Sequence, residues 1–113
     1  LEGVLAGLLE ACYRLDQIRL DHGELSRAPK HIIVGEQDQP QIVDFETAST
    51  QRRPANVTSI TQYLFIGSDL SKKINRIKGP VRRSRLMAAL KQYKDNRSFE
   101  NFSRITRVVL PQS

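Results

Sequence analysis

The spacing of apolar residues in the first twenty positions constrains the fold more than any other feature of this chain. Apolar side chains recur every three or four residues, at Leu1, Val4, Leu5, Leu8, Cys12, Leu15 and Ile18. That spacing places them on one face of an α-helix, with charged residues on the other faces. The stripe predicts a helix of about five turns that ends near Leu20 and buries its apolar side. Cys12 lies on this stripe, so we expect its thiol to be in the core.

Shorter stripes of the same kind follow in the second half of the chain. Helices are expected over about 57–65 and 82–94, with one between them and one at the end. The apolar residues of those two other helices are Leu70, Ile74 and Ile77, and Phe99, Phe102, Ile105 and Val109. Short polar residues precede each helix but the one at 82–94, and such residues cap helix N-termini. The expected caps are Asn56, either Ser68 or Asp69, and Ser98.

Two β-branched runs between the first helix and the later ones predict the only strands. Ile32-Ile33-Val34 and Gln41-Ile42-Val43-Asp44-Phe45 flank the polar turn residues 35–40, which is typical of a hairpin. The predicted fold class is therefore mainly α (α+β), with a long N-terminal helix, a short β-hairpin and several basic C-terminal helices. With 113 residues and no sign of a linker, residues 1–113 are expected to form a single domain.

The net charge of +6 is divided unevenly along the chain. Residues 1–50 carry four basic and nine acidic side chains, and residues 51–113 carry fourteen basic and three acidic ones. Clusters of basic residues favour a polyanion such as RNA, although a solvated basic surface has the same composition. The candidates for polyanion binding are Lys72, Lys73, Arg82, Arg83 and Arg85.

The number of cysteines and the hydropathy of the chain indicate the cellular compartment in which the protein is expected. The chain has one cysteine, which excludes an internal disulfide framework and fits a reducing cytoplasm. No apolar run reaches the roughly 20 residues that a spanning helix needs, so no membrane partner is expected. We therefore expect a cytoplasmic protein.

Two acidic motifs stand at the two ends of the predicted hairpin. His22-Gly23-Glu24-Leu25 lies between the long helix and the first strand, and Asp44-Phe45-Glu46 ends the second strand. A hairpin brings its two ends together, so the carboxylates of Glu24 and Asp44 can converge on one site that holds phosphate and a metal ion.

This order resembles the C-terminal lobe of the protein-kinase fold, in which a catalytic loop reading H-x-D, a hairpin and a D-F-G-like motif follow a long helix. It is more similar to the atypical kinases, whose loop reads His-Gly-Asp or His-Ala-Asp. The strongest resemblance is to an archaeal family of predicted serine/threonine protein kinases related to the Rio type. It covers residues 22–34, 42–49 and 52–65, and it is only general for the basic helices that follow.

The resemblance implies a role for each acidic motif. Glu24 occupies the place of the catalytic aspartate, which accepts or orients the proton of the substrate hydroxyl. Asp44 matches the aspartate that binds Mg²⁺ between the phosphates of ATP. Two positions depart from the pattern: Glu24 is one methylene longer than aspartate, and Glu46 replaces the usual glycine.

A third departure concerns the metal-binding asparagine of the catalytic loop. Pro29 stands five residues after Glu24, and His31 stands just before the strand. An imidazole is a poor ligand for Mg²⁺, so His31 contacts phosphate or holds the loop. Lys30 and Arg27 are candidates for supplying positive charge to phosphate. His22 is expected mainly to brace the loop.

The parts of a kinase that grip the nucleotide are missing from these 113 residues. A kinase needs a Gly-rich loop, a strand lysine and a helix glutamate that holds the lysine, and none of them is present. We therefore expect the C-lobe of a serine/threonine kinase that uses ATP and Mg²⁺ and is inactive without its N-lobe. The separated lobe is expected to form homo-oligomers that rebury its apolar surface.

Two other functions fit the same residues. The first is a pseudokinase-like module that binds RNA or protein through its basic helices. The second is a small-molecule phosphotransferase, whose catalytic loop also begins with His-Gly, although such enzymes continue with a His-Pro-Gly-Asn-like run that is absent after Leu25. Phosphate transfer and nucleotide binding distinguish these alternatives.

Overall fold

Helices dominate the part of the chain that the structure describes. The structure is a computed structural model that describes residues 2–25, 32–34, 40–42, 45 and 48–110. Within these residues it contains five helices and one two-stranded sheet. The chain divides into two compact units, residues 1–60 and 61–113. The prediction of a mainly helical chain with one hairpin is confirmed, and the kinase-like lobe and the single domain stay predictions.

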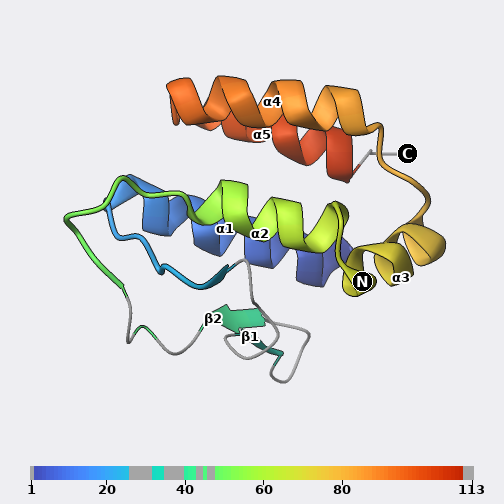
Figure 1. Cartoon of the computed structure of the whole chain (residues 1–113), viewed down its shortest axis with the longest axis horizontal. Coiled ribbons are helices and arrows are strands. Elements are labelled where there is room, and N and C mark those ends of the chain that lie inside the picture. Colours follow the sequence, from blue (N-terminus) through green and yellow to red (C-terminus); the bar gives the residue numbers. More distant parts are fainter. Residues whose placement is uncertain (1, 26–31, 35–39, 43–44, 46–47, 111–113) are drawn as a thin grey trace. The chain divides into compact units, whose positions relative to one another are not determined.

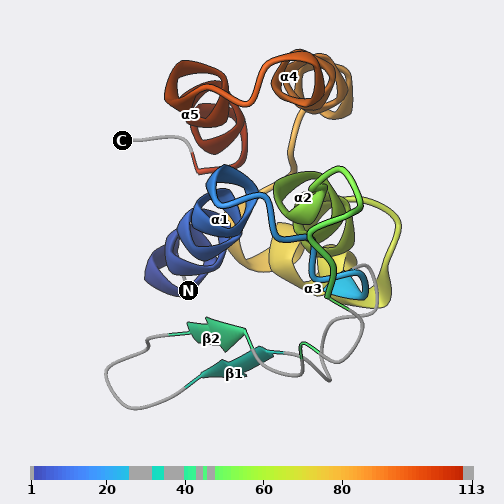
Figure 2. The same ribbon diagram turned by 90° about the vertical axis from the view of Figure 1, so that its left-hand side faces the viewer.

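The first unit contains α1 (Glu2–Gln17), β1 (Ile32–Val34), β2 (Pro40–Ile42) and the start of α2 (Asn56–Phe65). The strands pair antiparallel, with Ile33 opposite Gln41. β2 also contacts α1, and Figures 1 and 2 show the two strands next to each other as one ribbon pair. The predicted hairpin is therefore present, and it follows the long helix as expected.

The second strand is displaced from its predicted position. It begins at Pro40, which was expected in the turn, and it ends at Ile42. Phe45 is not in a strand, so the prediction that the strand runs through Phe45 is wrong at that end. A proline has no N–H to donate to a ladder, so it fits the first position of a strand.

One face of α1 is buried, as its apolar spacing predicted. Leu5, Leu8 and Leu9 are at most 3% exposed, and Cys12 is fully buried. Burial raises the pKa of the Cys12 thiol well above its ordinary value, and the Asp16 carboxylate one turn later raises it further. Because the thiolate is the reactive form, this thiol is inert in the folded chain.

Labelling of Cys12 tests that burial directly. At pH 8 the folded chain is expected to react with a thiol reagent at least about a hundredfold more slowly than the denatured chain, because both access and thiolate are lost. Absorbance of the released chromophore measures both rates. Equal rates for the folded and denatured chain would contradict the burial of α1.

The second unit contains the rest of α2, α3 (Asp69–Lys78), α4 (Arg83–Asp95) and α5 (Phe99–Val109). Two of the predicted caps are confirmed. Ser68 accepts a hydrogen bond from the Ser71 amide, and Ser98 accepts one from the Asn101 amide. α4 and α5 pack against each other, as Figure 2 shows. The buried apolar residues of this unit are Leu64, Phe65, Ile74, Leu86, Ala89, Leu90, Tyr93, Phe102, Ile105 and Val109.

Three residues of the predicted apolar stripes are exposed instead of buried. Ile18 is 67% exposed, Ile77 is 72% exposed and Phe99 is 66% exposed. Ile18 lies beyond the last residue of α1, and the other two lie in the last turn of α3 and at the first position of α5. Helical spacing assigns a residue to a face only where the helix continues on both sides of it, so the stripes were extended too far at their ends.

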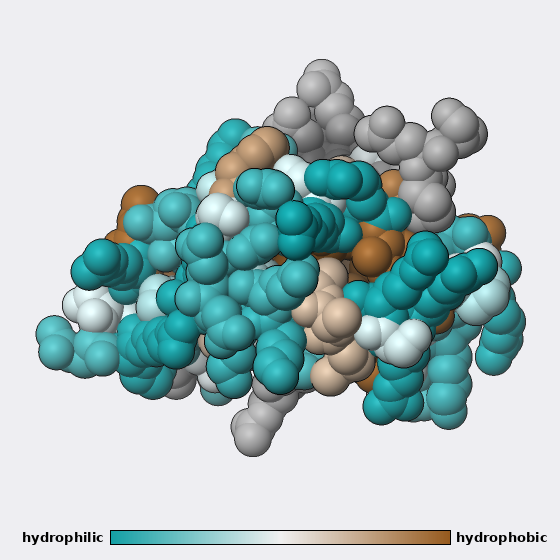
Figure 3. All heavy atoms as spheres, turned by 90° about the horizontal axis from the view of Figure 1, so that it is seen from above, coloured by the Kyte–Doolittle hydropathy of each residue, from teal (hydrophilic) through white to brown (hydrophobic). Residues whose placement is uncertain are grey.

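None of the helices in the described ranges combines the length and the apolarity that a membrane span requires. Hydrophilic side chains predominate on the face seen from above, which looks onto α4 and α5 (Figure 3).

Candidate functional site

The candidate catalytic loop, residues 20–25, begins just after the chain turns at the C-terminal end of α1. The Leu20 N–H donates to the Leu15 carbonyl at 3.0 Å, and the Arg19 N–H donates to the Asp16 carbonyl at 3.1 Å. Arg19 has a φ of 61°, the left-handed conformation that usually ends a helix with glycine. This pattern of two bonds closes the last turn of α1 and turns the chain into the loop.

Asp21 joins this loop to the segment that precedes α2. Its backbone exchanges two hydrogen bonds with Ser49, at 3.0 and 2.9 Å. One carboxylate oxygen accepts from the Arg52 side chain at 3.0 Å, and the other accepts from the Ala55 N–H at 3.1 Å. Arg52 is therefore committed to an ion pair within the first unit, and its positive charge is partly neutralised there.

His22 is the buried anchor of the loop. Its side chain is fully buried, and its backbone N–H donates to Asn56 Oδ1 at 2.8 Å. The amide nitrogen of Asn56 donates in turn to Asp16 Oδ1 at 2.8 Å and to the Leu20 carbonyl at 2.6 Å. The buried side-chain amide of Asn56 thus connects α1, the loop and the start of α2, so the position of the loop depends on both helices.

The N-terminus of α2 is capped by a residue of another helix. Asp16 is 3% exposed, and its carboxylate accepts from the backbone N–H groups of Asn56 at 3.0 Å and Val57 at 3.4 Å. A carboxylate there also offsets the positive end of the helix dipole. The prediction that Asn56 caps α2 is therefore wrong, because Asn56 is itself in the helix and its side-chain oxygen is used by His22.

Glu24 is positioned between two buried residues. Gly23 has a φ of 96°, which side-chain-bearing residues rarely adopt, so glycine is required for the turn after His22. The Glu24 N–H donates to His22 Nδ1 at 3.3 Å, which leaves the proton of a neutral imidazole on Nε2. Leu25 is 1% exposed. Glu24 itself is half-buried, so the loop holds its backbone while its side chain keeps access to solvent.

The two acidic motifs meet through their aromatic residues. The ring of Phe45, from Asp44-Phe45-Glu46, lies 4.8 Å from the ring of His22 between centroids, tilted by 59°. Twenty-three positions separate these two residues in the chain. Asp44 and Glu46 lie outside the described residues, so the expected convergence of the Glu24 and Asp44 carboxylates stays a prediction.

Three further predicted site residues also lie outside the described ranges: Arg27, Lys30 and His31. Among the described residues, no group of three or more His, Cys, Asp or Glu side chains is placed to hold a metal ion. His22 braces the loop, as expected. The polyanion candidates Lys72, Lys73, Arg82, Arg83 and Arg85 are all exposed.

Sequence reasoning missed Asp16, Asp21 and Asn56, which hold the loop. One signal pointed to Asp16: it stands in the last turn of a helix, where the dipole disfavours an acid unless donors from elsewhere compensate it. No local signal identified the partners, because the hydrogen bonds that the Asp16 and Asp21 carboxylates accept span 31 to 41 positions.

Comparison with known proteins adds no assignment. No protein-family model matches the chain, and no curated protein matches it.

Proposed function

We propose that this chain is the C-lobe of an ATP-dependent serine/threonine protein kinase. The observation that carries the proposal is the contact between His22 and Phe45. Phe45, the described member of Asp44-Phe45-Glu46, lies there against the loop that holds Glu24, in a unit where an antiparallel hairpin follows a long helix. Phosphoryl transfer needs two such carboxylates at one place, one for the hydroxyl and one for the metal ion.

Glu24 is proposed as the catalytic residue. Its carboxylate would accept a hydrogen bond from the attacking serine or threonine hydroxyl and take its proton as the bond to phosphorus forms. The hydrogen bond between the Glu24 N–H and His22 Nδ1 fixes the backbone from which the carboxylate reaches the substrate. Its half-buried side chain meets the need for access by a protein substrate.

Asp44 is proposed to hold Mg²⁺, because a carboxylate oxygen is a ligand that this ion prefers. Mg²⁺ binds oxygen ligands, and in nucleotide sites it is held by one or two carboxylates together with phosphate oxygens. When bound, Mg-ATP supplies the transferred phosphoryl group and neutralises charge on its oxygens. Arg27, Lys30 and His31 stay candidates for contacts with phosphate.

Replacement of Asp44 by asparagine tests the metal-binding role in the full-length protein that contains this chain. Asparagine keeps the shape but removes the charge that holds Mg²⁺, so phosphate transfer is expected to fall by at least about a hundredfold. Transfer from labelled ATP to protein measures the rate. Asp95→Asn is the matched control, since Asp95 is exposed at the end of α4. A wild-type rate in Asp44→Asn would contradict the proposal and favour a binding module.

A further inference from the structure

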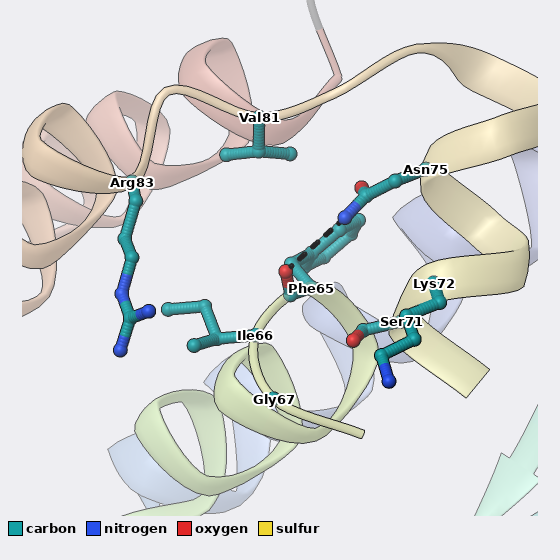
Figure 4. A pocket seen from close by; sticks show the side chains of 8 residues that line it. All are labelled: Phe65, Ile66, Gly67, Ser71, Lys72, Asn75, Val81 and Arg83. Atoms are coloured by element: carbon teal, nitrogen blue, oxygen red, sulfur yellow. Dashed lines mark hydrogen bonds between the residues drawn. The ribbon is translucent and has the colours of Figure 1, made fainter. Parts of the chain in front are cut away.

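A hollow in the second unit combines a small apolar space with cationic edges. Its volume is about 230 Å³, and its lining comes from the end of α2, from α3 and from the chain that leads into α4. The lining residues are Phe65, Ile66, Gly67, Ser71, Lys72, Asn75, Val81 and Arg83 (Figure 4). Pockets for drug-sized ligands begin near 300 Å³, so this hollow has room for about one ring system.

The positive charge of the chain is concentrated in the segment that forms this hollow. Residues 68–85 contain seven basic side chains and one acidic one, which is a net charge of +6. The other residues contain eleven basic and eleven acidic side chains, so they sum to zero. The excess charge is therefore carried by the segment that contributes most of the hollow's lining, and it includes Lys73, Arg76, Arg82 and Arg85, which are all exposed. A small anion would use only part of that charge.

The two cations that line the hollow stand on different sides of it. Lys72 and Arg83 are both exposed, and in Figure 4 the turn from Phe65 to Gly67 lies between them. Two separated cations suit two phosphates better than one. A nucleotide within a strand has a phosphate on each side of its nucleoside, which is the arrangement that these cations match.

The wall of the hollow presents a polar atom whose hydrogen-bonding capacity is unused. Asn75 Oδ1 is buried and accepts no hydrogen bond from any residue that the structure describes, while the amide nitrogen of Asn75 donates to the Phe65 carbonyl at 3.5 Å. An unpaired buried acceptor is costly, so a donor from a ligand is favourable there. A nucleoside offers N–H and O–H donors, whereas a phosphodiester group offers none.

We propose that this hollow is a subsite for one nucleotide of a single-stranded nucleic acid, with the flanking phosphates on Lys72 and Arg83. The nucleoside packs against the half-buried side chains of Ile66 and Val81. Phe65 forms the floor rather than a stacking platform, because it is 3% exposed and Lys78 Nζ lies over its ring at 5.6 Å. Single strands are favoured because a paired base must first be unpaired and unstacked before it can enter the hollow. The proposal is independent of the kinase assignment.

Charge reversal at the hollow is the first part of the test. The probe is a fluorescein-labelled single-stranded oligouridylate of about twelve nucleotides, titrated with the chain at two salt concentrations. Lys72→Glu with Arg83→Glu is expected to weaken binding by at least about tenfold and to lower the salt slope by about 1.4, since each phosphate contact in a single strand contributes about 0.7. Lys91→Glu with Arg107→Glu makes the same charge change at exposed positions on α4 and α5 and is expected to weaken binding by less than about threefold.

Filling the hollow without changing charge is the second part. Val81→Phe is expected to weaken binding by at least about fivefold with an unchanged salt slope. The phenyl ring would occupy the space of the nucleoside, whereas the contacts of Lys72 and Arg83 with phosphate would remain. Ile66→Phe fills the hollow from the opposite wall, and circular dichroism shows whether each variant is folded.

The proposal is overturned if Val81→Phe and Ile66→Phe are both folded and bind as the wild type does. It is also overturned if the Lys91 and Arg107 double variant loses as much affinity as the Lys72 and Arg83 double variant. Equal competition by inorganic phosphate or by a phosphoserine peptide would assign the hollow to anions in general and would also overturn it. Equal affinity for a duplex of the same length would remove the requirement for a single strand.

Discussion

Replacement of Glu24 by glutamine is expected to slow phosphate transfer by about 10²–10⁴ in the full-length protein, with little change in stability. A carboxamide has nearly the shape of the carboxylate but cannot take the proton of the attacking hydroxyl. The backbone of Glu24 stays fixed by His22 Nδ1 and by the buried Leu25, so the substitution removes chemistry rather than position. Turnover with saturating ATP, followed by transfer of labelled phosphate, measures the effect.

Two further variants make the Glu24 result specific. Glu24→Asp restores the residue that the resemblance implies for this position, and it is expected to retain most of the activity because the carboxylate remains. Glu10→Gln is the matched control, since Glu10 is exposed on α1 and pairs with Arg14 of the same helix at 2.6 Å. Near-wild-type turnover in Glu24→Gln, or an equal loss in Glu10→Gln, would show that Glu24 is not the catalytic acid–base group.

Replacement of Asp16 by alanine is expected to lower the free energy of unfolding by about 1–3 kcal/mol. The carboxylate accepts hydrogen bonds from the backbone and side-chain amides of Asn56 and from the Val57 N–H. Its removal leaves these buried donors without their acceptor and leaves the N-terminus of α2 without its cap. Because domains are stable by only about 5–15 kcal/mol, the loss is a large share of the total.

Urea denaturation measures this effect, with an unchanged slope expected for the transition. Asp16→Asn keeps an oxygen acceptor and is expected to cost less than the alanine variant. Asp95→Ala removes an exposed carboxylate and is expected to change the stability by less than about 0.5 kcal/mol. A denaturation midpoint for Asp16→Ala equal to that of Asp95→Ala would contradict the role of Asp16 as the cap of α2.

Local spacing in the sequence determined the kind and order of the elements. The helical periodicity of the first twenty residues predicted α1 and the burial of Cys12, and both are confirmed. The β-branched run at Ile32–Val34 predicted β1, and the serines at 68 and 98 predicted the caps that the structure contains. These features depend on residues at most four positions apart, so the linear order of the chain contains the information that decides them.

The tertiary structure alone decided how the candidate loop is held. Asp16, Asp21 and Asn56 were ordinary polar residues in the sequence, and one of them was assigned the wrong role. The hydrogen-bond partners of their side chains lie more than thirty positions away, and only packing of α1 against the start of α2 brings the charged and amide groups within hydrogen-bond distance.

The lining of the hollow beside Lys72 and Arg83 was likewise decided by the tertiary structure alone. Clustered charge was visible in residues 72–85, but the chain order does not indicate which basic side chains border a common space. That space arises where the end of α2, the face of α3 and the connection at Val81 meet around Asn75. Periodicity assigns a residue to a face of its own helix, whereas a cavity depends on how several elements pack together, and so its lining could be known only from the folded chain.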